Sequence, residues 1–190
     1  MKHFALNDQE GNRNCMVATW SNEQAAREIY LKPFEMSVKD ADCHAVMSSF
    51  NYIGNRWAGG CSELLQNVLR GEWGFLGFVE TDYFGVYGYM TADQAVRNGG
   101  DLMLCTTGND YNNVTVLTNS SKQAMRTSAK NILYTVVNSR AYEAENLNPG
   151  MAKWKVIMIG ADVVAALLIV GLEYTAIKNY KKRKEEEEEV

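Results

Sequence analysis

The stretch FLGFVETD, residues 75–82, decides the fold of this 190-residue chain. A short apolar run of this kind is typical of a strand buried in a sheet, and it ends on a carboxylate, Asp82. The sequence predicts helices on both sides of it, over residues 62–71 and 91–98. A strand that lies between two helices along the chain favours a parallel sheet with crossover helices.

The same alternation extends in both directions from this strand. Further strands are predicted over residues 3–6, 45–51 and 101–105, and further helices over residues 22–40, with a break near Pro33, and 120–142. Strand and helix therefore alternate through about four βα units, which is half of an eight-unit barrel. We expect an α/β fold, a partial (β/α) TIM-like barrel.

Polar side chains follow the predicted strands. Asn7, Glu10 and Arg13 come after the first strand, Asn51 ends the second, and Asp82 ends the third. In (β/α) barrels the carboxyl ends of the strands form the active-site face, so Asp82 is the best candidate for a catalytic carboxylate. From its position alone, Asp82 could equally be a helix N-cap or a loop aspartate.

A membrane segment is predicted near the C-terminus. Residues 156–177 read VIMIGADVVAALLIVGLEYTAI and contain two charges, Asp162 and Glu173. A helix that spans a membrane needs about 20 mostly apolar residues. The alternative is a buried amphipathic helix of a soluble domain, which Asp162 supports, because a charge near the middle of a bilayer costs about 2.5–3.5 kcal/mol on insertion scales.

The charges limit the orientation and the partners of the chain. Basic residues gather between Lys178 and Lys184, directly after the apolar segment, so the positive-inside rule places this end in the cytoplasm and the barrel portion outside. The whole chain has 19 Lys and Arg against 23 Asp and Glu, which argues against nucleic-acid binding. With four scattered Cys and two His, we expect no Cys/His zinc site.

Four segments in order resemble glycoside hydrolase family three, in its barrel domain. They are KHFALNDQEGNR at 2–13, REIYLKPF at 27–34, AVMSSFN at 45–51 and LRGEWGFLGFVETDY at 69–83. The resemblance runs from residue 2 to about residue 105, and more weakly through the last helix of the barrel portion. Phe4-Ala5-Leu6 follows the pair Lys2-His3 in this sequence, and this continuation points to the β-glucosidase or β-xylosidase side of the family.

The resemblance implies roles for five residues. Asp82 would be the nucleophile that forms a covalent glycosyl-enzyme, and Lys2 and His3 would donate hydrogen bonds to sugar hydroxyls. Arg13 would do the same or position the loop that does. Phe50 lies where many members have a Tyr beside the nucleophile. Without the resemblance, Lys2 and His3 would read as a chain end with no role. A retaining glycosidase also needs a second carboxyl group about 5–5.5 Å from the nucleophile, and it needs no metal or organic cofactor.

The resemblance also shapes the expected domain organisation. We expect a partial glycoside hydrolase barrel over residues 1–147, a linker over 148–155, a transmembrane helix over 156–177 and a charged cytoplasmic tail over 178–190. The acid/base of the family usually lies in an α/β sandwich domain. This favours the hypothesis that the chain is the C-terminal piece of a longer, membrane-anchored enzyme.

Two functions stay open from the sequence. The first is hydrolysis of O-glycosyl bonds in β-linked glycosides or oligosaccharides, in carbohydrate catabolism, with the missing barrel half and sandwich domain as further partners. The second is a catalytically silent, membrane-anchored remnant or sugar-binding module that lacks the acid/base residue. The presence of Asp82 with Lys2, His3 and Arg13 favours the first for the parent enzyme.

Overall fold

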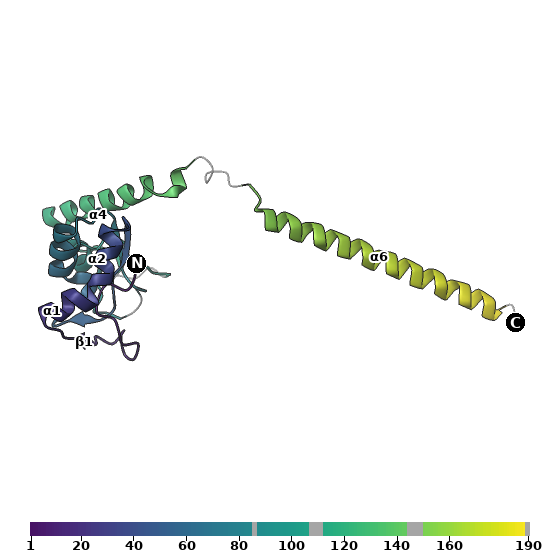
Figure 1. Ribbon diagram of the computed structural model, residues 1–190, viewed down its shortest axis with the longest axis horizontal. Coiled ribbons are helices and arrows are strands. Elements are labelled where there is room, and N and C mark those ends of the chain that lie inside the picture. Colours follow the sequence, from purple (N-terminus) through teal and green to yellow (C-terminus); the bar gives the residue numbers. More distant parts are fainter. Residues whose placement is uncertain (85–86, 107–111, 144–149, 189–190) are drawn as a thin grey trace. The chain divides into compact units, whose positions relative to one another are not determined.

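The computed structural model describes residues 1–84, 87–106, 112–143 and 150–188 (Figure 1). The chain divides into two compact units, Met1–Tyr142 and Glu143–Val190. The predicted boundary between barrel domain and linker, at residues 147 and 148, lies outside the described residues, so the predicted domain limits stay a prediction.

Parallel pairing forms the centre of the first unit. Strand β2 (Ala45–Met47) pairs in parallel with β5 (Phe78–Glu80), with Val46 opposite Val79. Single parallel bridges add Phe4 beside Ser48 on one side of this pair and Leu102 beside Glu80 on the other. Four chain segments thus lie parallel in sequence order, which confirms the predicted α/β arrangement. The predicted strands over residues 3–6 and 101–105 are each reduced to one bridge.

A small second sheet was not predicted. Strand β1 (Ala18–Thr19) pairs in parallel with β3 (Tyr52–Ile53), which pairs antiparallel with β4 (Arg56–Trp57). The turn between β3 and β4 contains Gly54 at φ +61°, a conformation that glycine adopts without strain. The sequence did carry a signal for this hairpin, since a Gly-Asn pair separates two short runs with aromatic residues.

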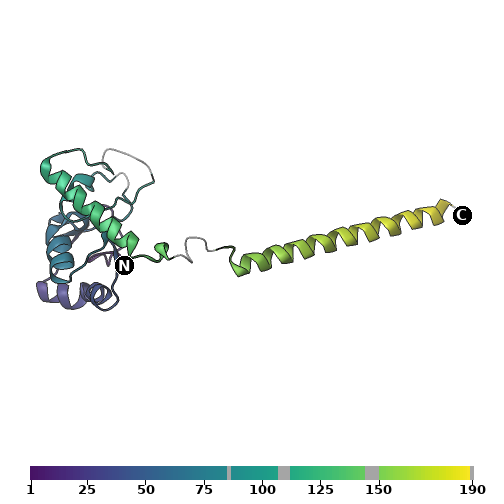
Figure 2. The ribbon, with the colours of Figure 1, turned by 90° about the horizontal axis from the view of Figure 1, so that it is seen from above.

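Helices surround the parallel strands. They are α1 (Glu23–Ala25), the π-helix η1 (Ala26–Tyr30), α2 (Lys32–Lys39), the 3₁₀ turn η2 (Ala58–Gly60), the π-helix η3 (Glu63–Glu72), α3 (Ala92–Arg97), α4 (Asn119–Val137) and the 3₁₀ turn η5 (Arg140–Tyr142). The predicted break near Pro33 is confirmed, because α2 starts at Lys32 with the proline in its first turn. Figure 2 shows α4 crossing the face of this unit that is seen from above.

The core lies between the strands and the helices. Val46 and Val79 are each 1% exposed and pack with leucines of η3 and with Phe4. Gly77 sits immediately before β5, where an added Cβ would lie 1.9 Å from the His44 carbonyl oxygen. Only glycine therefore permits the two chains to approach here, which fixes the start of the β2–β5 pair.

A buried ion pair joins three of these elements. Oδ2 of Asp101 accepts hydrogen bonds from Arg70 Nη2 at 2.7 Å and from the Val79 backbone N–H at 2.8 Å, and Oδ1 accepts one from Asn131 Nδ2 at 3.0 Å. Burial raises the pKa of Asp101 and lowers that of Arg70. The Asp101 carboxylate thus connects η3, β5 and α4 at the amino end of the strands.

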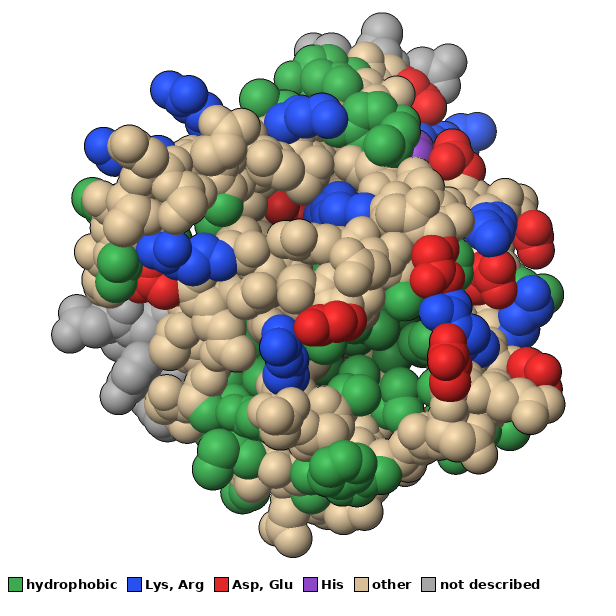
Figure 3. All heavy atoms as spheres, turned by 90° about the vertical axis from the view of Figure 1, so that its left-hand side faces the viewer, with side chains coloured by type: hydrophobic (Ala, Val, Ile, Leu, Met, Phe, Trp, Pro, Cys, Tyr) green, Lys and Arg blue, Asp and Glu red, His purple; other side chains and the backbone are tan. Residues whose placement is uncertain are grey.

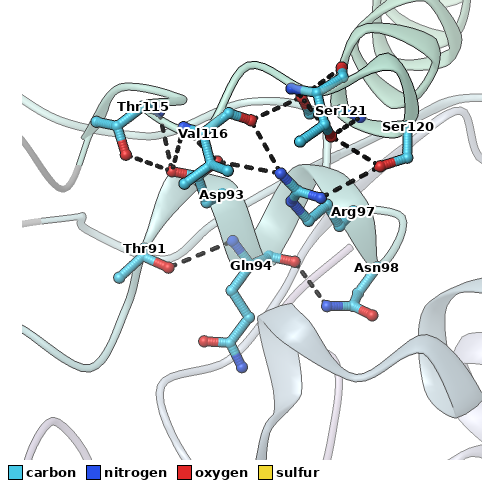
Figure 4. Close-up of polar contacts among 10 residues, drawn as sticks. Thr91, Asp93, Gln94, Arg97, Asn98, Thr115, Val116, Ser120 and Ser121 are labelled. Atoms are coloured by element: carbon cyan, nitrogen blue, oxygen red, sulfur yellow. Dashed lines mark hydrogen bonds and ion pairs between the residues drawn. The ribbon is translucent and has the colours of Figure 1, made fainter.

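A second polar cluster holds the segment before α4 against α3 (Figure 4). The Asp93 carboxylate accepts hydrogen bonds from the backbone N–H of Thr115 at 2.9 Å, from the Thr115 hydroxyl at 2.8 Å and from the Val116 N–H at 3.2 Å. Arg97 donates to the Val116 carbonyl at 2.9 Å and to the Ser120 hydroxyl at 3.4 Å. Two side chains of α3 therefore fix the entry into α4.

Paired charges cover part of the surface. Arg27 reaches Glu72 at 2.7 Å and Glu23 at 3.0 Å, and Lys39 reaches Glu35 at 2.8 Å. Figure 3 shows acidic and basic side chains beside one another along one edge of this unit. Hydrophobic side chains are exposed elsewhere on the same face. Exposed pairs of this kind contribute about 0–1 kcal/mol each, so they do not decide the fold.

In the described part of the second unit, the main element is the long helix α6 (Lys153–Glu188). The range Lys153–Lys184 is long enough to cross a membrane, and its most apolar window has a mean hydropathy of 2.3. Its side chains are exposed, although a core helix of a soluble protein can meet the same two criteria of length and composition. The apolar segment predicted over 156–177 lies entirely inside this helix.

Candidate active site

Asp82 lies two residues beyond the end of β5, at the carboxyl end of the parallel strands. The preceding Thr81 donates its backbone N–H to the Leu102 carbonyl at 2.9 Å, which continues the parallel pairing up to the aspartate. Asp82 is only 7% exposed, and its Oδ1 accepts a hydrogen bond from the Tyr83 N–H at 2.7 Å. The carboxylate is therefore buried and held in one orientation.

Two of the predicted site residues reach the other oxygen of this carboxylate. Arg13 Nη1 lies 3.0 Å from Asp82 Oδ2, and His3 Nε2 lies 3.4 Å from the same oxygen. His3 comes directly before the bridge at Phe4, and Arg13 lies on the loop that follows that bridge. The end of the first parallel segment and the end of β5 thus place their polar side chains together, as the barrel hypothesis predicts.

The ionisation of His3 follows from its surroundings. Burial lowers the pKa of His3 below the ordinary value of 6.5, and the positive charges of Lys2 and Arg13 lower it further, while the Asp82 carboxylate opposes both. The lowered pKa favours the neutral ring at pH 7. In the tautomer with its proton on Nε2, the ring can donate to Asp82 Oδ2 and leave Nδ1 as an acceptor.

Arg13 is itself positioned by two contacts. Its Nε donates to Glu10 Oε2 at 2.7 Å, and its guanidinium carbon lies 4.9 Å from the centre of the Phe50 ring. Contacts on both sides limit the freedom of the guanidinium, which then compensates the charge of Asp82. Sequence reasoning placed Glu10 on this face without predicting its contact with Arg13.

An aromatic group next to Phe50 was not predicted. The ring of Tyr87 meets Phe50 edge to face at 5.5 Å, and the Tyr89 hydroxyl donates to the Phe50 carbonyl at 3.1 Å. Asn14 Nδ2 donates to the Tyr87 hydroxyl at 3.2 Å. The signal that could have identified this group is the concentration of tyrosines directly after Asp82.

Lys2 lies near the site but outside its hydrogen bonds. The residue is exposed, and no hydrogen bond joins it to Asp82 in the part of the chain that the structure describes. Its charge nevertheless acts on the site, since it lowers the pKa of His3. It also opposes the rise in the pKa of Glu80, which burial causes first and the Asp82 carboxylate increases.

The site is rich in hydrogen-bond donors and carries one buried carboxylate. Among the residues that the structure describes, no group of three or more His, Cys, Asp or Glu could hold a metal ion. Arg13, His3 and the Tyr83 N–H all point at oxygens of Asp82. Such an arrangement can present a carboxylate as a nucleophile and donate hydrogen bonds to hydroxyl groups around it.

The fold and the site define an α/β domain with parallel strands and a candidate catalytic aspartate at their carboxyl end. Residues 1–133 match the glycosyl hydrolase family 3 N terminal domain. The chain therefore belongs to glycosyl hydrolase family 3. This finding confirms the resemblance that the four sequence segments carried.

Individual relatives agree with this assignment. Beta-glucosidase B of Emericella nidulans is 44% identical over 102 residues, which are 54% of this chain and 12% of that protein. Probable beta-glucosidase K of the same organism is 40% identical over the same length. The chain thus spans about an eighth of the length of these curated relatives.

Solved structures show the same similarity in three dimensions. Beta-glucosidase 3B from Thermotoga neapolitana, in complex with glycerol, matches with a TM-score of 0.63 and 30% identity, covering 81% of this chain and 23% of that one. A beta-glucosidase from Paenibacillus barengoltzii matches with a TM-score of 0.63 and 31% identity, covering 76% of this chain and 17% of that one. Both matches support an α/β fold.

Proposed function

We propose that this chain carries the nucleophile of a retaining β-glycoside hydrolase, and that Asp82 is that nucleophile. One observation supports the proposal above the others: a single buried carboxylate stands at the carboxyl end of β5 with Arg13 at 3.0 Å and His3 at 3.4 Å. The relatives named beta-glucosidase B and beta-glucosidase K favour a β-linked glucoside as substrate, with a β-xyloside as the alternative.

The reaction assigns one step to Asp82. Its carboxylate oxygen attacks the anomeric carbon, the bond from that carbon to the leaving-group oxygen breaks, and a covalent glycosyl ester remains until water hydrolyses it. Arg13 and His3 donate hydrogen bonds to sugar hydroxyls or hold Asp82 for the attack. We place Lys2 at the outer side of the same subsite and Phe50 beneath Arg13.

The second carboxyl group has to protonate a poor leaving group. Glu10 contacts Arg13 at 2.7 Å, and its side chain is 81% exposed, which does not suit a general acid whose pKa must be raised by burial. We therefore propose that the acid/base comes from an α/β sandwich domain, on a longer form of the chain or on a partner chain, together with further barrel strands.

Covalent trapping tests the assignment of Asp82 without any acid/base residue. The chain in detergent micelles is incubated with 2,4-dinitrophenyl 2-deoxy-2-fluoro-β-glucoside, whose dinitrophenolate leaves without protonation. We expect release of dinitrophenolate and one fluoroglucosyl adduct on the peptide that contains Asp82, detected by mass spectrometry. Asp82→Asn should give no adduct, and Asp40→Asn, at an exposed position, should be labelled like the unchanged chain.

Two outcomes would contradict the proposal. The adduct could appear on another residue, or Asp82→Asn could be labelled to the same extent as the unchanged chain. In either case Asp82 is not the nucleophile.

A catalytically silent sugar-binding module is the second candidate. It is favoured because both oxygens of the Asp82 carboxylate already contact donors of the chain itself, from Tyr83, His3 and Arg13. An activated aryl β-glucoside separates the two candidates, because a good leaving group needs little help from an acid. A glycosidase gives turnover that Asp82→Ala abolishes, whereas a binding module gives none.

We further propose that α6 anchors the chain in a membrane, with the barrel portion outside and the C-terminus in the cytoplasm. The support is a helix of sufficient length and apolarity, with basic residues from Lys178 to Lys184 at one end. Alkaline extraction of membranes should leave the chain in the pellet. An epitope tag at the C-terminus should resist protease in intact cells and be cut after the membrane is opened.

A further inference from the structure

A hollow in the first unit lies beside two exposed aromatic side chains. Its volume is about 240 Å³, and it is lined by Leu6, Asp8, Gln9, Thr19, Trp20 and Tyr30. Trp20 is 78% exposed and Tyr30 is 37% exposed. None of the contacts that hold Asp82 in place comes from these residues, so the hollow is separate from the candidate active site.

The Trp20 ring is supported from below. It lies over Gly54, where an added Cβ would be 3.7 Å from the ring, an ordinary packing distance. The neighbouring Thr19 is fixed by its hydroxyl, which donates to the Tyr52 carbonyl at 2.8 Å and accepts from Asn51 Nδ2 at 3.1 Å. Asn51 is fully buried. A mostly exposed indole ring is thus carried on a rigid base.

The polar groups of the hollow are available to a ligand. In the described ranges, the Asp8 carboxylate, the Trp20 indole N–H and the Tyr30 hydroxyl make no hydrogen bond within the protein, and these are one strong acceptor and two donors. Gln9 uses its Nε2 on the Gly11 carbonyl at 2.8 Å, which leaves its amide oxygen as a further acceptor.

This combination fits one class of ligand. Aromatic rings have an electron-rich face, which attracts the C–H groups that line one side of a pyranose ring. Carboxylate, amide, indole and phenol groups around them match the hydroxyls at the edge of the ring. The volume is below the roughly 300–1,000 Å³ of pockets for drug-sized ligands, so it suits one sugar ring rather than a larger compound.

We propose that this hollow, which we name the Trp20 site, binds one ring of a β-linked gluco-oligosaccharide as a second carbohydrate-binding site. The choice of a glucan rests on the proposed function. The site shares the segment between Leu6 and Trp20 with Arg13, so an oligosaccharide bound there is held on the same loop that contributes to the candidate active site. The chain then binds longer substrates at two places.

Binding of cellotetraose and laminaritetraose to the full chain in detergent micelles tests the proposal, measured by calorimetry. We expect Trp20→Ala to weaken binding at least tenfold and Tyr30→Ala to weaken it as well. Trp154→Ala removes another largely exposed indole, 63% exposed, from the other unit and should change binding less than twofold. Asp40→Asn, at an exposed position outside both sites, should also change it less than twofold.

A second readout separates this proposal from the proposed function. Trp20→Ala should be labelled at Asp82 by the fluoroglucoside as well as the unchanged chain, because a monosaccharide probe does not need the Trp20 site. If Asp82 is never labelled but Trp20-dependent binding is measured, the Trp20 site stands and the hydrolase proposal fails.

Three results would overturn the Trp20 site. If Trp20→Ala leaves binding unchanged, Trp20 does not contact the sugar. If Asp82→Asn abolishes binding, the sugar lies in the candidate active site. No binding of either tetrasaccharide at millimolar concentration would indicate that the exposed aromatic pair is a protein contact instead. Urea unfolding of each variant, followed by the fluorescence of the buried Trp57 and Trp73, shows whether the loss is caused by unfolding of the first unit.

Discussion

Replacing Asp101 with alanine should destabilise the first unit strongly. Its side chain is 1% exposed and pairs with Arg70, whose side chain is 17% exposed, at 2.7 Å. Removal of one partner of a buried ion pair destabilises a protein by about 3–5 kcal/mol, because the other charge stays buried and unpaired. Small domains have about 5–15 kcal/mol in total, so the loss would be a large part of the stability.

Urea unfolding followed by tryptophan fluorescence measures this loss. Trp57 and Trp73 are buried at 0% and 9% exposure and report on the first unit, whereas the helical signal of α6 would dominate circular dichroism. A loss of about 4 kcal/mol shifts the midpoint by about 2 M at a typical slope of about 2 kcal/mol per M urea. Asp40→Ala, at an exposed position, should change the stability by less than about 0.5 kcal/mol.

A double substitution tests the reason for the effect. Arg70→Met with Asp101→Leu should recover part of the stability that Asp101→Ala loses, because apolar side chains of similar volume can replace a buried pair. If Asp101→Ala loses less than about 1 kcal/mol, the carboxylate does not join the three elements as its hydrogen bonds indicate. If the double variant is less stable than Asp101→Ala, the unpaired charge is not the cause.

Three further perturbations have defined outcomes. Gly77→Ala should lower the stability in urea by at least about 1–3 kcal/mol, since its Cβ would lie 1.9 Å from the His44 carbonyl oxygen, and an unchanged midpoint would contradict this contact. An NMR titration should give His3 a pKa below 6.5. Asp82→Asn should lower this pKa further, because the carboxylate that it removes opposes the shift. The stability that neutral His3 contributes is then present above pH 6.5 and is lost as the pH falls through the lowered pKa. Burial raises the pKa of Asp93, but hydrogen bonds from Thr115 outweigh this effect and leave the pKa below 3.8. The stability that the Asp93 carboxylate contributes is therefore present above about pH 3.9 and is lost as the pH falls through the lowered pKa. Asp93→Asn should remove this acid dependence of the melting temperature, and a variant with the same dependence would refute the assignment.

The alternation of strands and helices was predictable because apolar periodicity is a local property of the sequence. Val46 and Val79 lie in apolar runs, and both are buried where β2 meets β5. The lengths of the strands were not predictable, because they depend on pairing with distant segments. Phe4 and Leu102 each form one bridge only, since a single neighbouring strand reaches each of them among the described residues.

The candidate site, like the fold, was predictable from the sequence only in part. The sequence indicated that Arg13 and Asp82 follow parallel strands, and the family resemblance added His3. The structure places Arg13 Nη1 at 3.0 Å and His3 Nε2 at 3.4 Å from Asp82 Oδ2. Their catalytic roles stay predictions. Tyr87 and Asn14 were missed because their contact spans 73 residues and joins two loops, which no local pattern encodes.

The contacts around Asp82 explain how a chain of this length can position the carboxylate that we propose as the nucleophile. Each donor to its carboxylate comes from the first parallel segment, from the loop after it or from Asp82's own neighbour, so the geometry depends on contacts inside the first unit. An acid/base residue has no such dependence, because it acts on the leaving group and approaches from the opposite side of the bond. The two carboxyl groups of a retaining glycosidase can therefore stand on separately folded elements. An activated substrate should then report on the Asp82 half alone, whereas an unactivated glucoside should need both halves.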